Sequence, residues 1–301
     1  MPELPEVETV AVGLQRLLPG RIVASVNSDN PKSFPNAPRD VQAFLVGSAV
    51  GPVSRRGKML LIKLSTDYTL VTHLKMTGQL VFRGHGVHFG AGHPNDSLIG
   101  ELPDKSTRVT VEFSDGSVLY FNDQRKFGWM RLLPTAEVMN VDFIKKIGPE
   151  PLGPNFTPRV FRDQLLRRKN TSIKAALLDQ TVVAGIGNIY ADESLWGAKI
   201  HPASRVADVA DNKIKDLYDC IRAVLQLSID QGGSSDRNYV DAEGRRGSYL
   251  KFANVFRRED QACPRCGTPI IKSRVAGRGT HTCPHCQKTP PSSVTTSAAK
   301  V

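Results

Sequence analysis

The sequence lacks the features of a membrane or secreted protein. It has no apolar run that approaches the roughly 18 to 20 residues of a membrane-spanning helix. Its first residues include Glu3, Glu6 and Glu8, where a signal peptide would carry basic residues. Cysteine is scarce, and four of the five cysteines form two C-x-x-C pairs, which excludes a disulfide framework. We therefore expect a soluble, cytoplasmic protein with no membrane partner.

Charged residues make up only 23% of the chain, too few for a disordered basic tail, yet the net charge is +11. Such an excess predicts a polyanionic partner, with nucleic acid favoured over a membrane surface. The segment 237–288 holds eleven Lys and Arg against four Asp and Glu, and so supplies +7 of the +11. A length of 301 residues suits two domains of ordinary size.

The first residues present an unusual group. If Met1 is removed, Pro2 becomes the N-terminus, and its secondary amine belongs to a class that titrates at about 7.7 to 8.0. An unprotonated amine can attack an electrophilic carbon and leave a charged iminium. Apolar residues at three- and four-residue spacing predict a helix over Pro5 to Leu18 directly behind it. The alternative is that Pro2 and Pro5 only stiffen the start of this helix.

From Arg21 to Arg131 the pattern changes to short β-prone runs separated by turns, which predicts a β-sandwich. The expected strands are Ile22 to Ser28, Ala49 to Ser54, Met59 to Ser65, Tyr68 to His73, Val109 to Phe113, Val118 to Phe121 and Trp129 to Leu133. Within this region Arg83 to Ser106 is rich in Gly, His and Pro, and we expect a long exposed loop there. Dense Pro and Gly place a linker at 148–154, after an N-terminal domain of residues 1–147.

The next part, residues 155–248, is predicted to be helical. Expected helices cover Pro158 to Arg168, Ser172 to Asp179, Ile189 to Trp196 and the long Val206 to Asp230. A Gly-x-Gly turn at Gly185 to Gly187 opens onto the third of these, and such a helix start can bind phosphate. The turn-rich stretch Gly232 to Gly247 is expected to be a mobile loop.

Two C-x-x-C pairs lie sixteen residues apart with a short hairpin between them, in a segment that spans 249–288. Four thiolates at this spacing predict one closed, tetrahedral and therefore structural zinc ion, held by Cys263, Cys266, Cys283 and Cys286. Residues 289–301 have no apolar pattern and are expected to be a disordered tail.

Six motifs in order make the chain resemble bacterial formamidopyrimidine-DNA glycosylases, of the superfamily that includes endonuclease VIII, over residues 1–288. They are Pro2 to Glu8, Arg55 to Lys58, His73 to Gly78, Asp123 to Gly128, Gly185 to Tyr190, and the four-cysteine ribbon with Arg278. The resemblance implies an α+β multidomain fold: an N-terminal β-sandwich with flanking helices, a helix-two-turns-helix domain and a C-terminal zinc ribbon. It also implies DNA between the domains.

The resemblance implies a base-excision-repair enzyme with the following roles. Pro2 attacks C1′ of a damaged nucleotide and cleaves the strand by β,δ-elimination, Glu3 shuttles protons, and Lys58 lies over the lesion. Met76, Arg125 and Phe127 fill the gap left by the extruded nucleotide, and His73, Asn188 and Arg278 hold its flanking phosphates. The implied partner is damaged double-stranded DNA, bound by a monomer.

Oxidised purines, namely 8-oxoguanine and formamidopyrimidines, are favoured as substrates by Leu4 after Glu3 and by the complete Met76, Arg125 and Phe127 set. One alternative is an oxidised-pyrimidine glycosylase of the endonuclease VIII type. Another is a zinc-ribbon nucleic-acid-binding protein without catalytic activity, which leaves Pro2, Glu3 and Lys58 unexplained.

Overall fold

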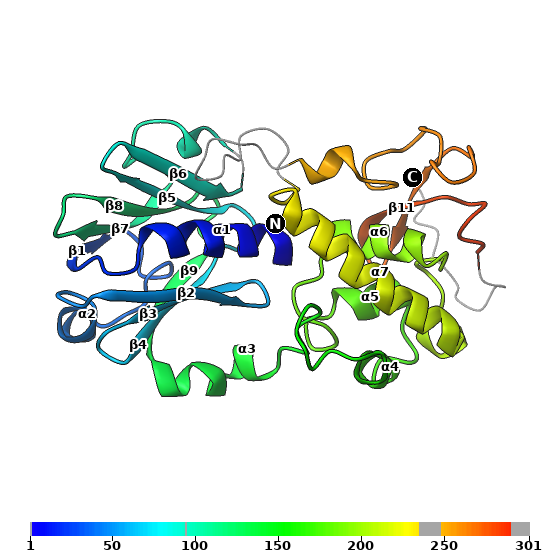
Figure 1. Ribbon diagram of the computed structural model, residues 1–301, viewed down its shortest axis with the longest axis horizontal. Coiled ribbons are helices and arrows are strands. Elements are labelled where there is room, and N and C mark those ends of the chain that lie inside the picture. The colour runs from blue at the N-terminus through cyan, green and yellow to red at the C-terminus, as the bar shows by residue number, and fades with distance from the viewer. Residues whose placement is uncertain (1, 94, 235–247, 290–301) are drawn as a thin grey trace. The chain divides into compact units, whose positions relative to one another are not determined.

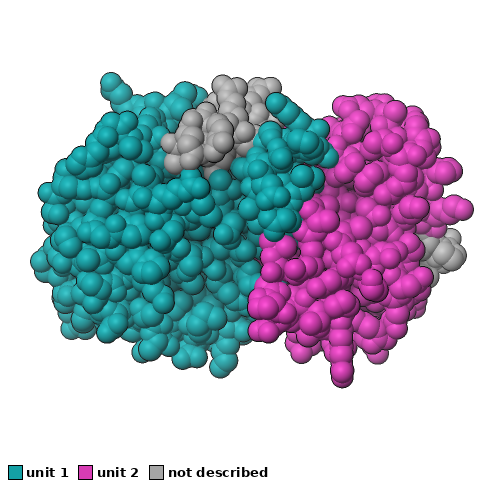
Figure 2. Space-filling model, viewed as in Figure 1, with its two compact units in different colours: residues 1–150, 225–252 teal, residues 151–224, 253–301 magenta. Residues whose placement is uncertain are grey.

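The computed structural model describes residues 2–93, 95–234 and 248–289 (Figure 1). Residues 235–247 of the expected mobile loop and 290–301 of the expected tail therefore lie outside the described part. The chain divides into two compact units: unit 1 comprises residues 1–150 and 225–252, and unit 2 comprises residues 151–224 and 253–301 (Figure 2).

Unit 1 is a sandwich of two antiparallel sheets, as the sequence predicts. One sheet has the order β1 (Val23–Ser28), β7 (Thr107–Phe113), β8 (Val118–Asp123), β5 (Gly78–Gly84), β6 (Val87–Gly92). The other has the order β2 (Val50–Arg56), β3 (Met59–Leu64), β4 (Tyr68–His73), β9 (Trp129–Pro134). Inward-facing residues from alternate positions, such as Leu60 and Ile62 on β3 and Leu80 and Phe82 on β5, form one apolar core.

Helix α1 (Leu4–Leu17) completes this core with the apolar face that the sequence predicts, including Val7, Val10 and Leu14. It packs on β2 of one sheet and on β6 of the other. The remaining helical segments of residues 1–150 are α2 (Pro38–Phe44), η1 (Asp96–Leu98), η2 (Thr135–Asn140) and α3 (Asp142–Lys145).

The segment Arg83 to Ser106 is not the exposed loop that its composition predicts. It contains β6, which pairs with β5 in antiparallel register, from Gln79 opposite Gly92 to Gly84 opposite Val87. Phe89 of β6 is fully buried. The ring of Phe89 fits against α1 because Gly13 has no side chain: a Cβ there would lie 2.3 Å from the ring. Leu98 then packs on the outer face of the same sheet. The prediction was wrong because tertiary packing outweighs the low strand propensity of glycine.

Unit 2 holds α4 (Pro158–Leu166), α5 (Ile173–Leu178), α6 (Asn188–Gly197), η3 (Val206–Asp208) and the hairpin of β10 (Ile271–Val275) and β11 (Arg278–Thr282). Helix α7 (Asp211–Asp230) begins in unit 2 and ends in unit 1, where η4 (Tyr249–Lys251) also lies. The predicted helix over Val206 to Asp230 is wrong in its first part, because Val209 adopts an extended conformation between η3 and α7. No helix in the described ranges has the length and apolarity needed to cross a membrane.

Candidate functional site at the end of the sandwich

The direction of α1 follows from two contacts with β2. The side chain of Gln15 accepts the Val53 backbone N–H at 2.5 Å, and Glu8, about two turns earlier, forms an ion pair with Arg55. The start of α1 therefore points toward the end of β2, where the turn at Gly57 and Lys58 follows. Pro2 and Glu3 are both buried at that start.

Glu6 fixes this start. Glu3 is the N-cap residue of α1, and the Glu6 carboxylate accepts the Glu3 backbone N–H at 2.8 Å. Its other oxygen accepts the backbone N–H of Ser234 at 2.8 Å. Gly233, with φ +87°, packs on Glu6 so closely that a Cβ would lie 3.3 Å from the carboxylate. Glu6 thus accepts backbone hydrogen bonds from its own helix start and from a segment more than two hundred residues away.

His73 marks the same end of the four-stranded sheet. It pairs with Met59 on one side and Trp129 on the other, so Lys58, next to Met59, lies beside it. Burial, followed by the positive charges of Lys75 and Lys58, lowers the pKa of His73 to about 3. Its Nδ1 accepts the Lys75 backbone N–H at 3.0 Å, which assigns the single proton of the neutral ring to Nε2. His73 is therefore a neutral hydrogen-bond donor.

Two connections between the sheets run side by side at this end. Residues 74–77 join β4 to β5 and residues 124–128 join β8 to β9. Their flanking residues pair within each sheet: His73 with Trp129 in the four-stranded sheet and Gly78 with Asp123 in the five-stranded sheet. This pairing brings Met76 of the first connection to the same end as Arg125 and Phe127 of the second. The Arg125 guanidinium lies 4.9 Å from the centre of the Phe127 ring, which is 54% exposed.

The fully buried carboxylate of Asp123 ties the two connections together. It accepts hydrogen bonds from the Thr77 hydroxyl, from the Arg125 backbone N–H at 3.2 Å and from the Gly128 backbone N–H at 2.6 Å. A side chain at Gly128 would meet the Phe121 ring at 2.7 Å. Asp123 has no role predicted from the sequence, although it opens the motif that contains Arg125 and Phe127.

In unit 2, the two turns between α5 and α6 present Asn188 as the first residue of α6. Gln180 holds these turns by donating to the Ile186 carbonyl and accepting from the Gly185 N–H, where φ is +82°. The Asn188 amide donates to the Gly279 carbonyl at 3.0 Å, next to the exposed Arg278. Asn188 and Arg278, 90 residues apart in sequence, therefore lie together.

Two buried side chains, Lys174 and Asp192, join the β10–β11 hairpin to these helices. Lys174 donates to the Asp192 carboxylate at 2.6 Å, to the Thr280 hydroxyl at 2.8 Å and to the Gly279 carbonyl at 3.0 Å. Asp192 also accepts the His281 backbone N–H at 2.9 Å. The side chains of Lys174 and Asp192 are completely inaccessible to solvent. The hairpin is thus fixed against α5 and α6 by a buried ion pair.

The four cysteines of the ribbon fit one zinc ion. Their Sγ atoms all lie within 4.8 Å of one another, with Cys266 3.4 Å from Cys283 and 3.6 Å from Cys286. Tetrahedral thiolates about 2.3 Å from a zinc ion are about 3.8 Å apart. The Trp196 indole N–H points at the Cys263 Sγ from 3.4 Å. Four thiolates leave no open position on the metal, so the site holds one structural zinc ion.

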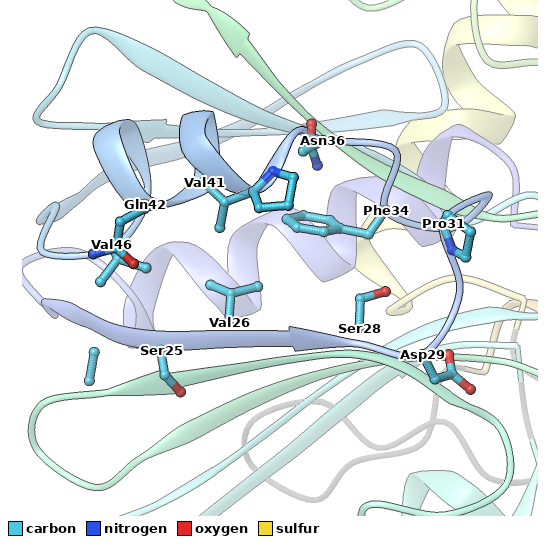
Figure 3. Close-up of a pocket in the computed structure, with 12 residues that line it drawn as sticks. Ser25, Val26, Ser28, Asp29, Pro31, Phe34, Asn36, Val41, Gln42 and Val46 are labelled. Carbon is cyan, nitrogen blue, oxygen red and sulfur yellow. The ribbon is translucent and has the colours of Figure 1, made fainter.

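A separate hollow in unit 1 lies between β1 and α2 (Figure 3). Its volume is about 500 Å³, and apolar side chains such as Val26, Phe34 and Val41 line it. Two of its polar side chains are bonded to the chain itself: Ser28 donates to the Arg108 carbonyl, and Asn36 accepts from the Leu132 N–H. We assign no chemistry to this pocket.

Comparison with known proteins agrees with both units. Three family models match: the formamidopyrimidine-DNA glycosylase N-terminal domain over residues 1–130, the H2TH domain of the same enzymes over 147–239, and a zinc finger found in FPG and IleRS over 260–289. A formamidopyrimidine-DNA glycosylase from Pediococcus pentosaceus is 42% identical over 287 residues, which cover 95% of this chain and 99% of that protein.

Solved structures give the same result. The Lactococcus lactis Fpg bound to DNA with an abasic site is 37% identical, with a TM-score of 0.84, over 95% of this chain and 100% of that one. A variant of that protein bound to Fapy-dG DNA has the same identity and TM-score and covers 96% of this chain and 100% of its own. MutM bound to DNA with carbocyclic 8-oxo-G is 36% identical, with a TM-score of 0.82, over 96% of this chain and 100% of that one. The chain belongs to the formamidopyrimidine-DNA glycosylase family.

Proposed function

We propose that the chain is a bifunctional DNA glycosylase and abasic-site lyase that removes oxidised purines from duplex DNA. The observation that carries this proposal is the gathering at one end of the sandwich: the buried start of α1 points to the turn with Lys58, beside His73 and the two connections. The solved relatives were bound to DNA with an abasic site, Fapy-dG or 8-oxo-G, which supports oxidised purines.

In this proposal Pro2 is the nucleophile. Its amine forms a bond to C1′ of the damaged nucleotide, the bond from C1′ to the base breaks, and the opened sugar remains on Pro2 as an iminium. The iminium acidifies the neighbouring C–H, so the two phosphates leave in successive β and δ eliminations. The position of Pro2 supports this role, because removal of Met1 would place its free amine at the start of α1, directly beside the buried Glu3.

Glu3 is proposed to move protons to and from the opening sugar ring. Glu3 directly follows Pro2 in the chain, and only 4% of its surface is exposed. A buried carboxylate within reach of the reacting carbon is suited to general acid and base catalysis. Lys58, which is 7% exposed, is proposed to place its ammonium over the lesion.

The remaining residues are proposed to hold the distorted duplex. Met76, Arg125 and Phe127 would occupy the gap left by the extruded nucleotide, with exposed Phe127 as the wedge between base pairs. His73, Asn188 and Arg278 would bind phosphates, which position DNA without reading its sequence. We propose that the protein is cytoplasmic and associates with the nucleoid through its DNA substrate. We also propose that it is a monomer without a membrane partner.

We propose the following domain assignment: a catalytic domain at 1–147, a linker at 148–154, a DNA-binding domain with a lesion-capping loop at 155–248, a zinc-ribbon finger at 249–288 and a tail at 289–301. The three family models, over 1–130, 147–239 and 260–289, support this order of domains.

Borohydride trapping tests the mechanism. A duplex with one 8-oxoguanine opposite cytosine should give a covalent complex with the wild type. The yield should fall with Pro2→Gly, whose N-terminus is a primary amine, and should be strongly reduced with Glu3→Gln. If the wild type gives no covalent complex, or if a variant that retains Met1 cleaves normally, the amine mechanism is wrong. Absence of the complex would favour a zinc-ribbon protein that binds nucleic acid without catalysis.

A substrate panel tests the lesion class. The wild type should excise 8-oxoguanine and formamidopyrimidine from single-lesion duplexes faster than it excises 5-hydroxycytosine or thymine glycol. The opposite ranking would assign the chain to the oxidised-pyrimidine branch instead.

A further inference from the structure

The turn that carries Lys58 follows two arginines that point at one distant carboxylate. Arg55 Nη1 lies 2.6 Å from Glu150 Oε2, and Arg56 Nη1 lies 2.8 Å from Glu150 Oε1. The side chains of Arg55 and Arg56 are only 10% and 19% exposed. These two cations are therefore engaged within the protein and do not belong to its phosphate-binding surface.

Glu150 also holds the backbone of the turn. Its Oε1 accepts the Gly57 N–H at 2.5 Å, directly before Lys58. Gly57 has φ +57°, a left-handed conformation that favours glycine. Arg56 adds hydrogen bonds to the carbonyls of Ile147 and Gly148, at 3.0 and 2.7 Å. The segment 147–150 thus encloses the turn through two arginines and one backbone amide.

The network continues to the helix that carries Pro2 and Glu3. Besides Glu150, the Arg55 guanidinium binds Glu8 of α1 through Nε. Arg55 therefore links the start of α1 to the same carboxylate that holds the Lys58 turn. Although burial raises the pKa of Glu150, the charge of Arg55 and the hydrogen bonds from Arg55, Arg56 and Gly57 lower it overall. Glu150 is ionised at neutral pH, as these contacts require.

From this geometry we infer that Glu150 is a positioning residue for Lys58: it acts on the reaction by fixing the Gly57 turn in register with α1. The inference rests on the proposed function, in which Lys58 meets the lesion. Neutral glutamine at position 150 would keep one acceptor but lose the charge and present an NH₂ group to the donors of Arg55 or Gly57. The turn would then shift while the sandwich core stayed intact.

The test is a double-mutant cycle with single-turnover excision of 8-oxoguanine as the readout. Glu150→Gln should slow excision on the order of tenfold to a hundredfold, because small displacements of a reacting group have effects of this size. In a Lys58→Ala background the same substitution should change the remaining rate less than about twofold, since the group that it positions is absent. A merely structural role would slow both backgrounds equally.

The matched control is Asp115→Asn, which breaks the partly exposed ion pair of Asp115 with Arg21. Asp115 lies in the turn between β7 and β8, at the opposite end of β8 from Asp123. This control should lower the melting temperature without slowing excision. If Glu150→Gln does not fold, Arg56→Met removes one of the two arginines from Glu150 and should show the same dependence on Lys58.

The inference is overturned if Glu150→Gln excises at the wild-type rate, or if it slows excision by the same factor with and without Lys58. These outcomes differ from failure of the proposed function, in which the wild type itself would show no excision.

Discussion

The segments proposed to contact DNA are held in place by different interactions in the two units. In unit 1, the carboxylate of Asp123 joins two connections between sheets that already share a large apolar core. In unit 2, the hairpin with Arg278 depends on four cysteines and on the buried pair of Lys174 and Asp192, and the buried apolar cluster around the cysteines is small. A small domain that cannot bury enough apolar surface needs a metal to fold. A sandwich with a large core is already stable and needs only hydrogen bonds to order its connections.

Zinc removal should have the largest effect. It should disrupt the hairpin of unit 2 and leave unit 1 intact. Structural zinc contributes apparent free energies of about 10 to 16 kcal/mol to folding of isolated fingers. We expect Cys283→Ser to release the metal, expose the hairpin to protease and weaken DNA binding on the order of a hundredfold or more. Metal analysis, limited proteolysis and DNA titration measure this. Wild-type DNA affinity in a zinc-free protein would refute it.

Asp123→Asn should have the next largest effect, in unit 1 alone. Loss of charge-assisted hydrogen bonds in a buried site costs about 1.5 to 3 kcal/mol per bond, so we expect the free energy of unfolding to fall by about 2 to 4 kcal/mol. Zinc content should not change. Denaturant unfolding checks the prediction, with Asp115→Asn as the control. A larger loss of unfolding free energy in the control would show that Asp123 does not stabilise the two connections as proposed.

The pH dependence of stability should report His73. Its folded pKa is about 3 and the ordinary value is 6.5, so the unfolded chain takes up a proton between these values and the folded chain does not. Stability from this residue is therefore full above about pH 6.5 and falls as the pH drops toward 3. The loss at pH 5 should be about 2 kcal/mol. His73→Gln should remove this part of the pH dependence; an unchanged curve would mean that His73 charges in the folded protein.

The smallest expected effect is a change in the salt dependence of DNA binding, measured for one residue of each unit. Arg278→Ala should weaken DNA binding and reduce the slope of log affinity against log salt by about 0.9, because one cation leaves a phosphate. His73→Ala should weaken binding with the slope unchanged, because a neutral ring releases no counterion. Equal slope changes in the two variants would contradict the neutral state of His73.

The elements with a strong local pattern could be predicted from the sequence: the α1 helix, most strands of unit 1 and the cysteine ribbon. Strands β5 and β6 were missed because both contain glycines, whose place in a strand depends on distant neighbours, as for Gly84 against Ser117 and Gly90 against Leu98. Local periodicity cannot reveal Asp123 or Glu150 either, because their roles come from partners up to 95 residues away. Asp123 opens a named motif, but Glu150 lies in the predicted linker, and only the fold shows what each carboxylate binds.

The discontinuity of unit 1 has a consequence for how the protein is made. Because residues 225–252 belong to unit 1, a ribosome must synthesise most of the chain before that unit is complete. Until Ser234 has emerged, Glu6 lacks the hydrogen bond that the Ser234 backbone N–H donates to it at the start of α1. The order of synthesis therefore places one of the contacts that hold the start of α1 after translation of the intervening helices of unit 2.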